Sequence, residues 1–359
     1  MSHALAEVRA ALPPGPIGGP AAWTGPQMMR DGSWLHQFTP AELGEIDAAI
    51  LAHQASGQEM GRISRETFRL PTLAPVLAGV VEEMLHGRGF VQFRGFPVER
   101  YSTEQAAIAY LGIGAHLGSF RSQNAKGHLL GHVRDLGLDI GKPTTRYYQT
   151  NRELEYHTDS CDIVGLLCLR TSRSGGESMI VSSVTLHDEM LKRRPDLYAK
   201  LFHAFPTDRR GEIPPGMLPW FEVPVFSWHE GQLTTIYSGQ YIRSAQQNFP
   251  EARRLSALER EALDMFDALT RDPSLNLKIE FRPGDMQFLH NHQILHSRTD
   301  FEDWPEPERR RHLFRLWLSP PGGRPLPPSF AQRYGQLTPG DRGGIVTRDT
   351  VLKFVLEPQ

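Results

Sequence analysis

Cysteine is scarce in this sequence, and long apolar runs are absent from it. The 359 residues include two cysteines, Cys161 and Cys168, and their spacing matches no zinc-binding or redox motif. Both lie in an apolar run, so we expect buried thiols in a reducing compartment. No apolar run approaches the roughly 20 residues of a membrane span, and no signal peptide is visible. We therefore expect a cytoplasmic protein that does not enter a membrane.

An excess of charge of either sign is also missing. Lys and Arg number 39 and Asp and Glu 41, which gives a formal net charge of −2. A balanced charge provides no general attraction to nucleic acid or to an anionic membrane surface. Neither is therefore an expected partner.

The first 38 residues are rich in Pro and Gly and predict an N-terminal arm, either loose or draped over the domain or a partner subunit. Residues 39–359 are expected to form one catalytic domain. Helix-start signals at Thr39-Pro40, Ser102 and Ser256 predict three helices, and others are expected over residues 75–86 and 185–194. Short strands are predicted over residues 89–97, 128–134, 146–150, 162–170, 178–184, 223–227, 232–237, 277–281, 285–296 and 312–318, with a loop over 205–222. This pattern favours a mainly β, double-sheet fold with flanking helices.

Chemistry is first indicated by His157 and Asp159, which are two residues apart. In an extended segment their side chains point the same way, so an imidazole and a carboxylate can share one metal ion. Two His and one carboxylate that leave the other positions open suit Fe(II) binding a cosubstrate and O2. Taken alone, the pair is weak evidence, because most such triplets in a chain of this length are surface or turn residues.

A third ligand is expected from the His-rich segment near residue 290. His290, His292 and His296 share parity, so a regular strand would place all three on one face. Periodicity alone therefore cannot choose among them.

The order of four motifs resembles that of the TauD/TfdA-like family of Fe(II)/2-oxoglutarate-dependent oxygenases. The motifs are His157-x-Asp159, the turn Gly175-Gly176-Glu177-Ser178, the distal His296 followed by Ser297-Arg298, and Arg311. The resemblance covers roughly residues 85–320 and implies a double-stranded β-helix, a cupin-like jelly roll. It also implies a dioxygenase that uses Fe(II), 2-oxoglutarate and O2 to oxidise a C–H bond of a small molecule and forms succinate and CO2. Hydroxylation is the expected outcome, and desaturation and oxidative cleavage stay open.

Under this resemblance His157, Asp159 and His296 bind the iron, and His290 and His292 are packed around them. Arg311 binds the distal carboxylate of 2-oxoglutarate with help from the hydroxyl of Ser178. A guanidinium suits this task because it forms two parallel hydrogen bonds with a carboxylate and stays charged. The adjacent Arg309 and Arg310 are alternatives, and Arg311 is preferred because it stands four residues before Arg315 on the same strand face.

The resemblance says less about the substrate. Arg315 either binds an acidic group of the substrate or forms a structural salt bridge, and an anionic substrate is the expectation. Asn124, Gln149 and Tyr237 lie in segments that border the site in relatives. Two other functions stay open at this point: a cupin-type metalloenzyme that uses no 2-oxo acid, and a small-molecule binding protein without catalysis. The arm is also compatible with a homo-oligomer.

Overall fold

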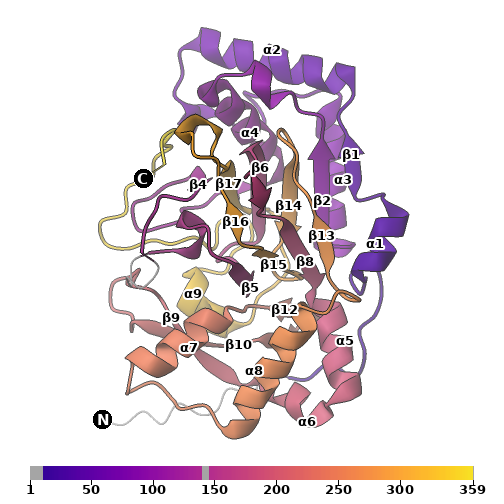
Figure 1. The fold of residues 1–359 in the computed structure, drawn as a ribbon, viewed down its shortest axis with the longest axis vertical. Helices are drawn as coiled ribbons and strands as arrows, with labels where there is room; N and C mark the ends of the chain where they lie inside the picture. The colour runs from indigo at the N-terminus through magenta and orange to yellow at the C-terminus, as the bar shows by residue number, and fades with distance from the viewer. Residues whose placement is uncertain (1–10, 140–144, 359) are drawn as a thin grey trace.

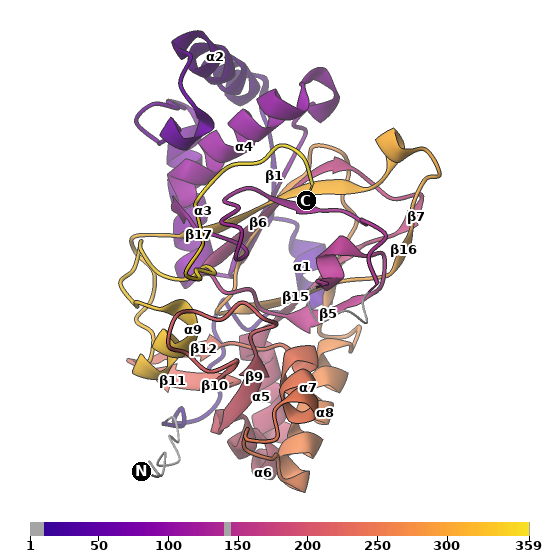
Figure 2. The same ribbon diagram turned by 90° about the vertical axis from the view of Figure 1, so that its left-hand side faces the viewer.

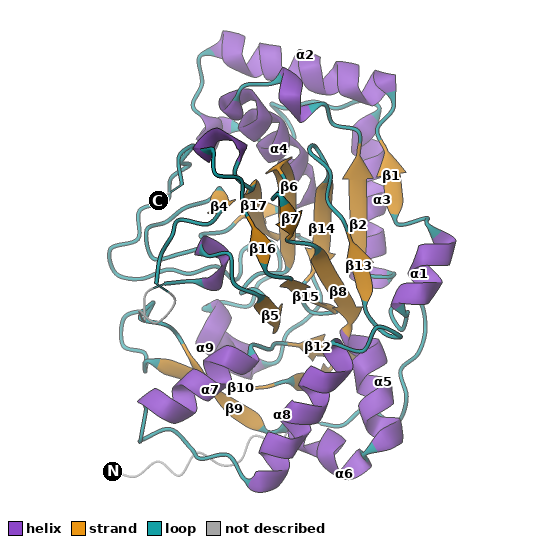
Figure 3. Ribbon diagram, in the orientation of Figure 1, coloured by secondary structure: helices purple, strands orange, loops and turns teal. Residues whose placement is uncertain are grey.

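The computed structural model describes residues 11–139 and 145–358. Two β-sheets face each other at its centre, with helices on the outside (Figures 1 and 3). The seven-stranded major sheet has the order β1-β2-β14-β6-β17-β3, and β4 also pairs with β17. Its strands are β1 (Leu35–Gln37), β2 (Phe90–Arg94), β3 (Ser119–Phe120), β4 (Gly131–Val133), β6 (Ile163–Arg170), β14 (Met286–His290) and β17 (His312–Ser319).

The minor sheet has four strands in the order β13-β8-β15-β5. They are β5 (Leu154–His157), β8 (Ser178–Ser182), β13 (Leu277–Ile279) and β15 (Ile294–Arg298). Apolar side chains from both sheets pack together, among them Phe90, Val164, Ile180, Leu289 and Ile294. These two facing sheets form the jelly roll.

Helices α2 (Pro40–Ser56), α3 (Leu73–His86) and α4 (Thr103–Leu117) cover the outer face of the major sheet (Figure 2). The central strand β6 is therefore buried on both faces, as its continuous apolar sequence predicted. The start signals at Thr39, Ser102 and Ser256 are complete capping boxes for α2, α4 and α8 (Ala257–Thr270).

A second group of elements lies at the opposite end of the molecule from α2 (Figure 1). It comprises α5 (Ser183–Arg193), α6 (Pro195–Tyr198), α7 (Gly239–Asn248) and α8, with the hairpins β9 (Ala204–Asp208)–β10 (Trp220–Pro224) and β11 (Phe226–His229)–β12 (Gln232–Thr235). Val181 and Leu295 of the minor sheet pack into this group against Phe226 and Phe266. The remaining elements are α9 (Ala331–Tyr334) and the strand pair β7 (Ser174–Gly175)–β16 (Phe301–Glu302).

The described part of the N-terminal arm is draped over this body. The backbone N–H groups of Ile17 and Gly18 donate to Asp188, and Trp23 is buried. The arm continues through helix α1 (Gly25–Asp31) into β1, which pairs in parallel with β2. Residues 1–10 of the arm lie outside the described residues.

Three secondary-structure predictions are wrong. Residues 146–150 contain a 3-10 turn, Tyr147–Gln149, instead of a strand, and residues 205–222 contain paired strands. Residues 285–296 form two strands in different sheets, because the chain turns at 291–293. The parity argument for His290, His292 and His296 fails at this turn. Within the described ranges, no helix is long and apolar enough to cross a membrane.

Candidate functional site

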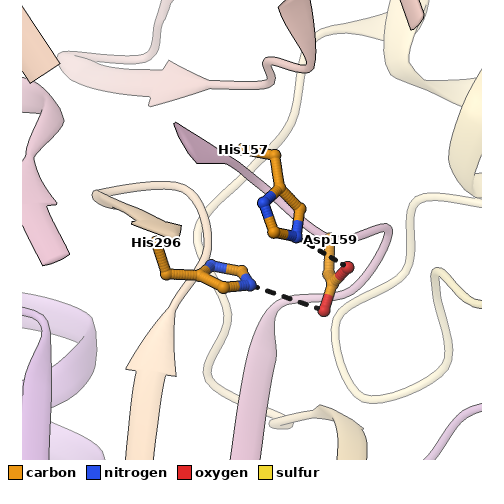
Figure 4. Close-up of side chains that lie close together, drawn as sticks. All are labelled: His157, Asp159 and His296. Carbon is orange, nitrogen blue, oxygen red and sulfur yellow. Dashed lines mark ion pairs between the residues drawn. The ribbon is translucent and has the colours of Figure 1, made fainter. Parts of the chain in front are cut away.

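The structure brings His157, Asp159 and His296 together at one end of the minor sheet. His157 ends β5 and is paired in register with His296 on the neighbouring strand β15. His157 Nε2 lies 3.8 Å from one carboxylate oxygen of Asp159, and His296 Nε2 lies 3.8 Å from the other. One ligand atom from each residue falls within 4.8 Å of the others. Figure 4 shows both imidazoles turned toward the carboxylate, an arrangement that could hold a metal ion.

The protonation states of this cluster suit metal binding. His157 Nδ1 is 2.9 Å from the carbonyl oxygen of Glu155, to which it can donate, and this leaves the Nε2 lone pair free. Burial lowers the pKa of His157 and lowers that of His296 to about 3. Burial alone would raise the pKa of Asp159, but the charge of Arg315 and the hydrogen bond from Trp317 hold it below its usual range. The site is therefore two neutral imidazoles and one carboxylate.

Neighbouring side chains hold Asp159 in position. The indole Nε1 of Trp317 donates to Asp159 Oδ2 at 2.8 Å. The side-chain oxygen of Asn291 accepts the backbone N–H of Asp159 at 3.0 Å. Sequence reasoning missed both residues, although Trp317 shares strand parity with Arg315, and this signal could have identified it.

A first cavity extends from the cluster toward Arg311, and we name it the Arg311 cavity. Its lining includes His157, Ser178, His296, Arg298, Arg311 and Arg315. Arg311 is 5% exposed, and its Nη1 has no hydrogen-bond partner among the described residues. Burial lowers the pKa of Arg311 to about 10, so the guanidinium is still charged at neutral pH. A buried cation without a carboxylate is costly, and an anion in this cavity would neutralise it.

The hydroxyl of Ser178 faces the same cavity but already has a partner. Ser178 Oγ donates to Gln287 Oε1 at 3.0 Å, and Gln287 Nε2 is buried without a partner. Turning the Gln287 amide around would let its N–H donate to Ser178 and would free the serine hydroxyl for a ligand.

A second cavity lies on the other side of the cluster, and we name it the Arg333 cavity. It is lined by residues of the hairpin β9–β10, of helix α7 and of the C-terminal segment, together with two residues of the cluster; the lining includes Arg146, His157, Asp159, Tyr237, Tyr241 and Arg333. Sequence reasoning missed Arg146, Tyr241 and Arg333. No local motif marks them, because they come from a loop, a helix that was not predicted, and a segment beyond the recognisable motifs.

Arg315 lines both cavities. Its Nε donates to Gln123 at 2.8 Å, and its Nη1 lies 3.6 Å from Asp159 Oδ2. The guanidinium also lies over the ring of Tyr148, 4.5 Å from its centre. Arg311, Leu313 and Arg315 all face the Arg311 cavity, so the expected common face of the two arginines is present.

Of the other three predicted substrate contacts, Tyr237 lines a cavity, whereas Asn124 and Gln149 do not. Tyr237 lines the Arg333 cavity, but its hydroxyl donates to Asp267 at 2.6 Å. Neither Asn124 nor Gln149 is among the residues that line the two cavities. Asn124 accepts the N–H of His128, and Gln149 accepts that of Arg146. The geometry gives these two side chains local roles in their loops.

The other two histidines of the His-rich segment and both cysteines are packed inside the protein. His292 Nε2 lies 2.7 Å from Asp162, and His290 Nδ1 lies 3.0 Å from Gln293. Both imidazoles are fully buried. Cys161 and Cys168 are free and buried, as expected.

A jelly roll that carries two histidines and one carboxylate at its open end defines the class of non-haem Fe(II) oxygenases. The profile of the taurine catabolism dioxygenase TauD, TfdA family matches residues 53–317. The chain therefore belongs to this family and is an Fe(II)- and 2-oxoglutarate-dependent dioxygenase.

Individual relatives agree with this assignment. The chain is 29% identical to FR-33289 synthase of Streptomyces rubellomurinus over 330 residues, covering 89% of this chain and 95% of that protein. It is 31% identical to the taurine hydroxylase-like protein SAT17 of Stachybotrys chartarum over 326 residues, covering 86% and 83%. The structure of the non-heme iron oxygenase OrfP in complex with Fe and alpha-ketoglutaric acid has the same fold. The TM-score is 0.60 at 16% identity, covering 79% of this chain and 93% of that one.

Proposed function

We propose that His157 Nε2, a carboxylate oxygen of Asp159 and His296 Nε2 hold the iron. The proposal is supported by their mutual distances, by the contact that fixes the His157 tautomer, and by the hydrogen bond from Trp317 that orients Asp159. Three protein ligands from one side leave half of an octahedral coordination sphere for exogenous ligands.

Arg311 binds the distal carboxylate of 2-oxoglutarate in this proposal. The observation that carries it is a buried Arg311 Nη1 without a partner, in a cavity whose lining also includes both histidines of the cluster. A bidentate carboxylate would satisfy the orphan N–H and neutralise the charge. Ser178 adds a hydrogen bond once Gln287 has turned. When bound, iron and 2-oxoglutarate together supply the oxidising power. 2-Oxoglutarate and O2 are consumed, succinate and CO2 are formed, and a C–H bond of the substrate is oxidised.

The protein's own part is placement and exclusion of water. Trp317 holds the Asp159 carboxylate, and the apolar residues Leu154, Val164, Leu166 and Leu313 line the Arg311 cavity. A dry cavity strengthens the contact between Arg311 and a carboxylate. The Arg333 cavity lies beside the cluster and is the position for the substrate.

The substrate is proposed to be a small molecule with an anionic group, bound by an arginine of the Arg333 cavity; Arg315, at the border of the two cavities, is the arginine that the sequence indicated. Two arginines of the Arg333 cavity, Arg209 and Arg333, form no salt bridge among the described residues, and this favours an anionic substrate. The name of one relative refers to taurine, an aminosulfonate. We also propose that residues 39–359 act as one catalytic domain. A cytoplasmic location is proposed on the strength of two free buried thiols.

The test compares Arg311→Leu with Arg310→Leu in anaerobic protein loaded with Fe(II). Titration with 2-oxoglutarate should produce a weak visible charge-transfer band in the wild type. Loss of a charged, bidentate contact weakens binding by about 100-fold, so Arg311→Leu should bind 2-oxoglutarate poorly. Arg310 contacts the carbonyl groups of Trp304 and Pro305 outside the cavity, and its variant should bind normally.

His157→Ala should abolish the Fe(II)-dependent formation of succinate. Wild-type affinity for 2-oxoglutarate in Arg311→Leu, or weak binding in Arg310→Leu alone, would contradict the assignment of the arginine.

A further inference from the structure

The chain beyond β17 folds back across the Arg333 cavity. Arg342 anchors this C-terminal segment through its Nε, which donates to both carboxylate oxygens of the fully buried Asp162 at 2.9 and 3.0 Å. Arg324 adds buried hydrogen bonds to Leu233 and Gln293. The segment, drawn in yellow in Figure 1, contributes Arg333 and Ile345 to the cavity wall. It lies beyond residue 317, where the match to the family profile ends.

Arg333 is held in the cavity without a carboxylate partner. Its Nε donates to Ser160 Oγ at 2.5 Å, and Ser160 directly follows Asp159. Its guanidinium carbon lies 5.3 Å from the ring centre of Phe221. Among residues 11–139 and 145–358, no hydrogen bond or ion pair of Arg333 involves Asp or Glu. The side chain is therefore fixed by its Nε and its stem, with the outer N–H groups available.

The acidic residues of the cavity form no salt bridge with Arg333 among the described residues, because each has another cationic partner. Glu212 pairs with Arg146 and acts on Arg333 only at longer range. Glu155 pairs with Arg243 at 2.5 Å, Asp208 lies 3.9 Å from Arg210, and Asp159 lies 3.6 Å from Arg315. The arginines of the lining that are left without such a pair are Arg209 and Arg333.

A second arginine adds to the positive charge of the Arg333 cavity. Arg209 donates to the backbone carbonyl groups of Leu218 and Gln332 and lies 5.2 Å from the ring centre of Phe221. It has no carboxylate partner within the described residues either. Burial lowers the pKa of Arg209 to about 10, so it is charged at neutral pH. Two uncompensated guanidinium groups thus lie at one aromatic ring.

We propose that Arg333 binds an oxyanionic group of the substrate, a carboxylate, sulfonate or phosphonate, by a forked contact. This rests on the function proposed above, in which the Arg333 cavity receives the substrate. Arg315 is less free to do so, because its Nε is bonded to Gln123 and its Nη1 lies 3.6 Å from Asp159. Arg333 has two outer N–H groups in the geometry that such anions accept.

The experiment measures binding to anaerobic holoenzyme saturated with Fe(II) and 2-oxoglutarate, by isothermal titration calorimetry. The probes are butyrate, propane-1-sulfonate, propylphosphonate and the uncharged butyramide, which differ in the acidic group. Wild-type protein, Arg333→Met, Arg333→Lys and Arg348→Gln are compared. Methionine keeps an apolar stem against Phe221 while removing the charge. Arg348 lies on the same segment and is exposed, so its variant is the matched control.

At least one anionic probe should bind the wild type more tightly than butyramide, and the tightest of the three identifies the acid class. Losing the charged fork should weaken that binding by roughly tenfold or more in Arg333→Met. Arg333→Lys should lie in between, and Arg348→Gln should match the wild type. Should Arg333→Met fail to fold, the same comparison is made with Arg333→Lys, which keeps the charge but loses the fork.

The inference is overturned if the Arg333 variants bind the anionic probes as the wild type does, or if no anionic probe binds more tightly than butyramide. Either result would leave the proposed 2-oxoglutarate-dependent oxygenase activity intact as long as binding of 2-oxoglutarate still depends on Arg311, although the second result would also remove the proposal of an anionic substrate. Failure of the Arg311 dependence would instead remove the function itself. The two failures are therefore distinguishable.

Discussion

Replacing Trp317 with Phe tests whether the carboxylate of Asp159 must be held in place to bind metal. The indole Nε1 donates to Asp159 Oδ2 at 2.8 Å, and the indole is 3% exposed. Phe keeps most of the ring and removes the donor. In the variant, Oδ2 would keep only more distant neighbours, Arg315 Nη1 at 3.6 Å and His296 Nε2 at 3.8 Å.

A hydrogen bond to a charged group contributes about 1.5–3 kcal/mol, and about 1.4 kcal/mol corresponds to a factor of ten in affinity. Removal of a partner that orients a metal ligand typically weakens metal binding by about 10- to 100-fold. We expect Trp317→Phe to raise the dissociation constant for Fe(II) by a factor in this range. The assay is an anaerobic competition titration against a coloured chelator, repeated with Co(II).

The control is Trp34→Phe, which removes the same donor elsewhere. Trp34 Nε1 donates to the carbonyl oxygen of Met28 at 2.8 Å, in a part of the core that does not contact the cluster. Both variants should lose some stability, and thermal unfolding measures this. If metal affinity is the same in the two variants and in the wild type, the hydrogen bond to Asp159 has no role in metal binding.

Three further predictions concern the surrounding structure. Arg342→Met should lower the free energy of unfolding in urea by about 3–5 kcal/mol, because it leaves the buried Asp162 without its cation; a loss below 1 kcal/mol would contradict the anchoring role. Hydrogen bonds outweigh burial and lower the pKa of Glu259 from 4.5 to about 2. Glu259 therefore contributes about 3 kcal/mol to the free energy of unfolding at neutral pH. This contribution is lost as the pH falls from 4.5 through about 2. The stability difference between Glu259→Gln and the wild type, measured by denaturation, should narrow over that range; a constant difference would refute it. Gly176→Ala should weaken 2-oxoglutarate binding, since the residue has φ +78° and its new Cβ would meet Arg311 Nε at 3.1 Å; unchanged affinity on titration would argue against this.

The local parts of the fold could be predicted from sequence because they depend on neighbouring residues. A capping box at Thr39 needs only Glu42 three residues later. The continuous apolar sequence of β6 predicts a strand that is covered on both faces, whichever elements cover it. The pair His157 and Asp159 followed the same logic, since an extended backbone alone places the two side chains together.

The wrong predictions concern segments whose backbone conformation depends on contacts with distant parts of the chain. The break between β14 and β15 is fixed by Asn291, whose N–H donates to Asp162 and whose side chain accepts the N–H of Asp159. Residues 205–222 lack periodicity, yet Thr207 and Phe221 pair across a hairpin. Cross-strand bonds of this kind are not visible in the residues of one segment.

The sequence by itself determined the class of chemistry: the order of His157, Asp159, His296 and Arg311 already pointed to iron and 2-oxoglutarate. The tertiary structure alone decided which arginines lack partners and therefore which ligands the cavities favour. Arg333 looks like any other arginine in the sequence, and Arg311 stands out there only by the order of the motifs. In the described structure Arg311 is buried and Arg333 is half-buried, and neither guanidinium forms a salt bridge with a carboxylate. Only the packing of distant segments produces that imbalance.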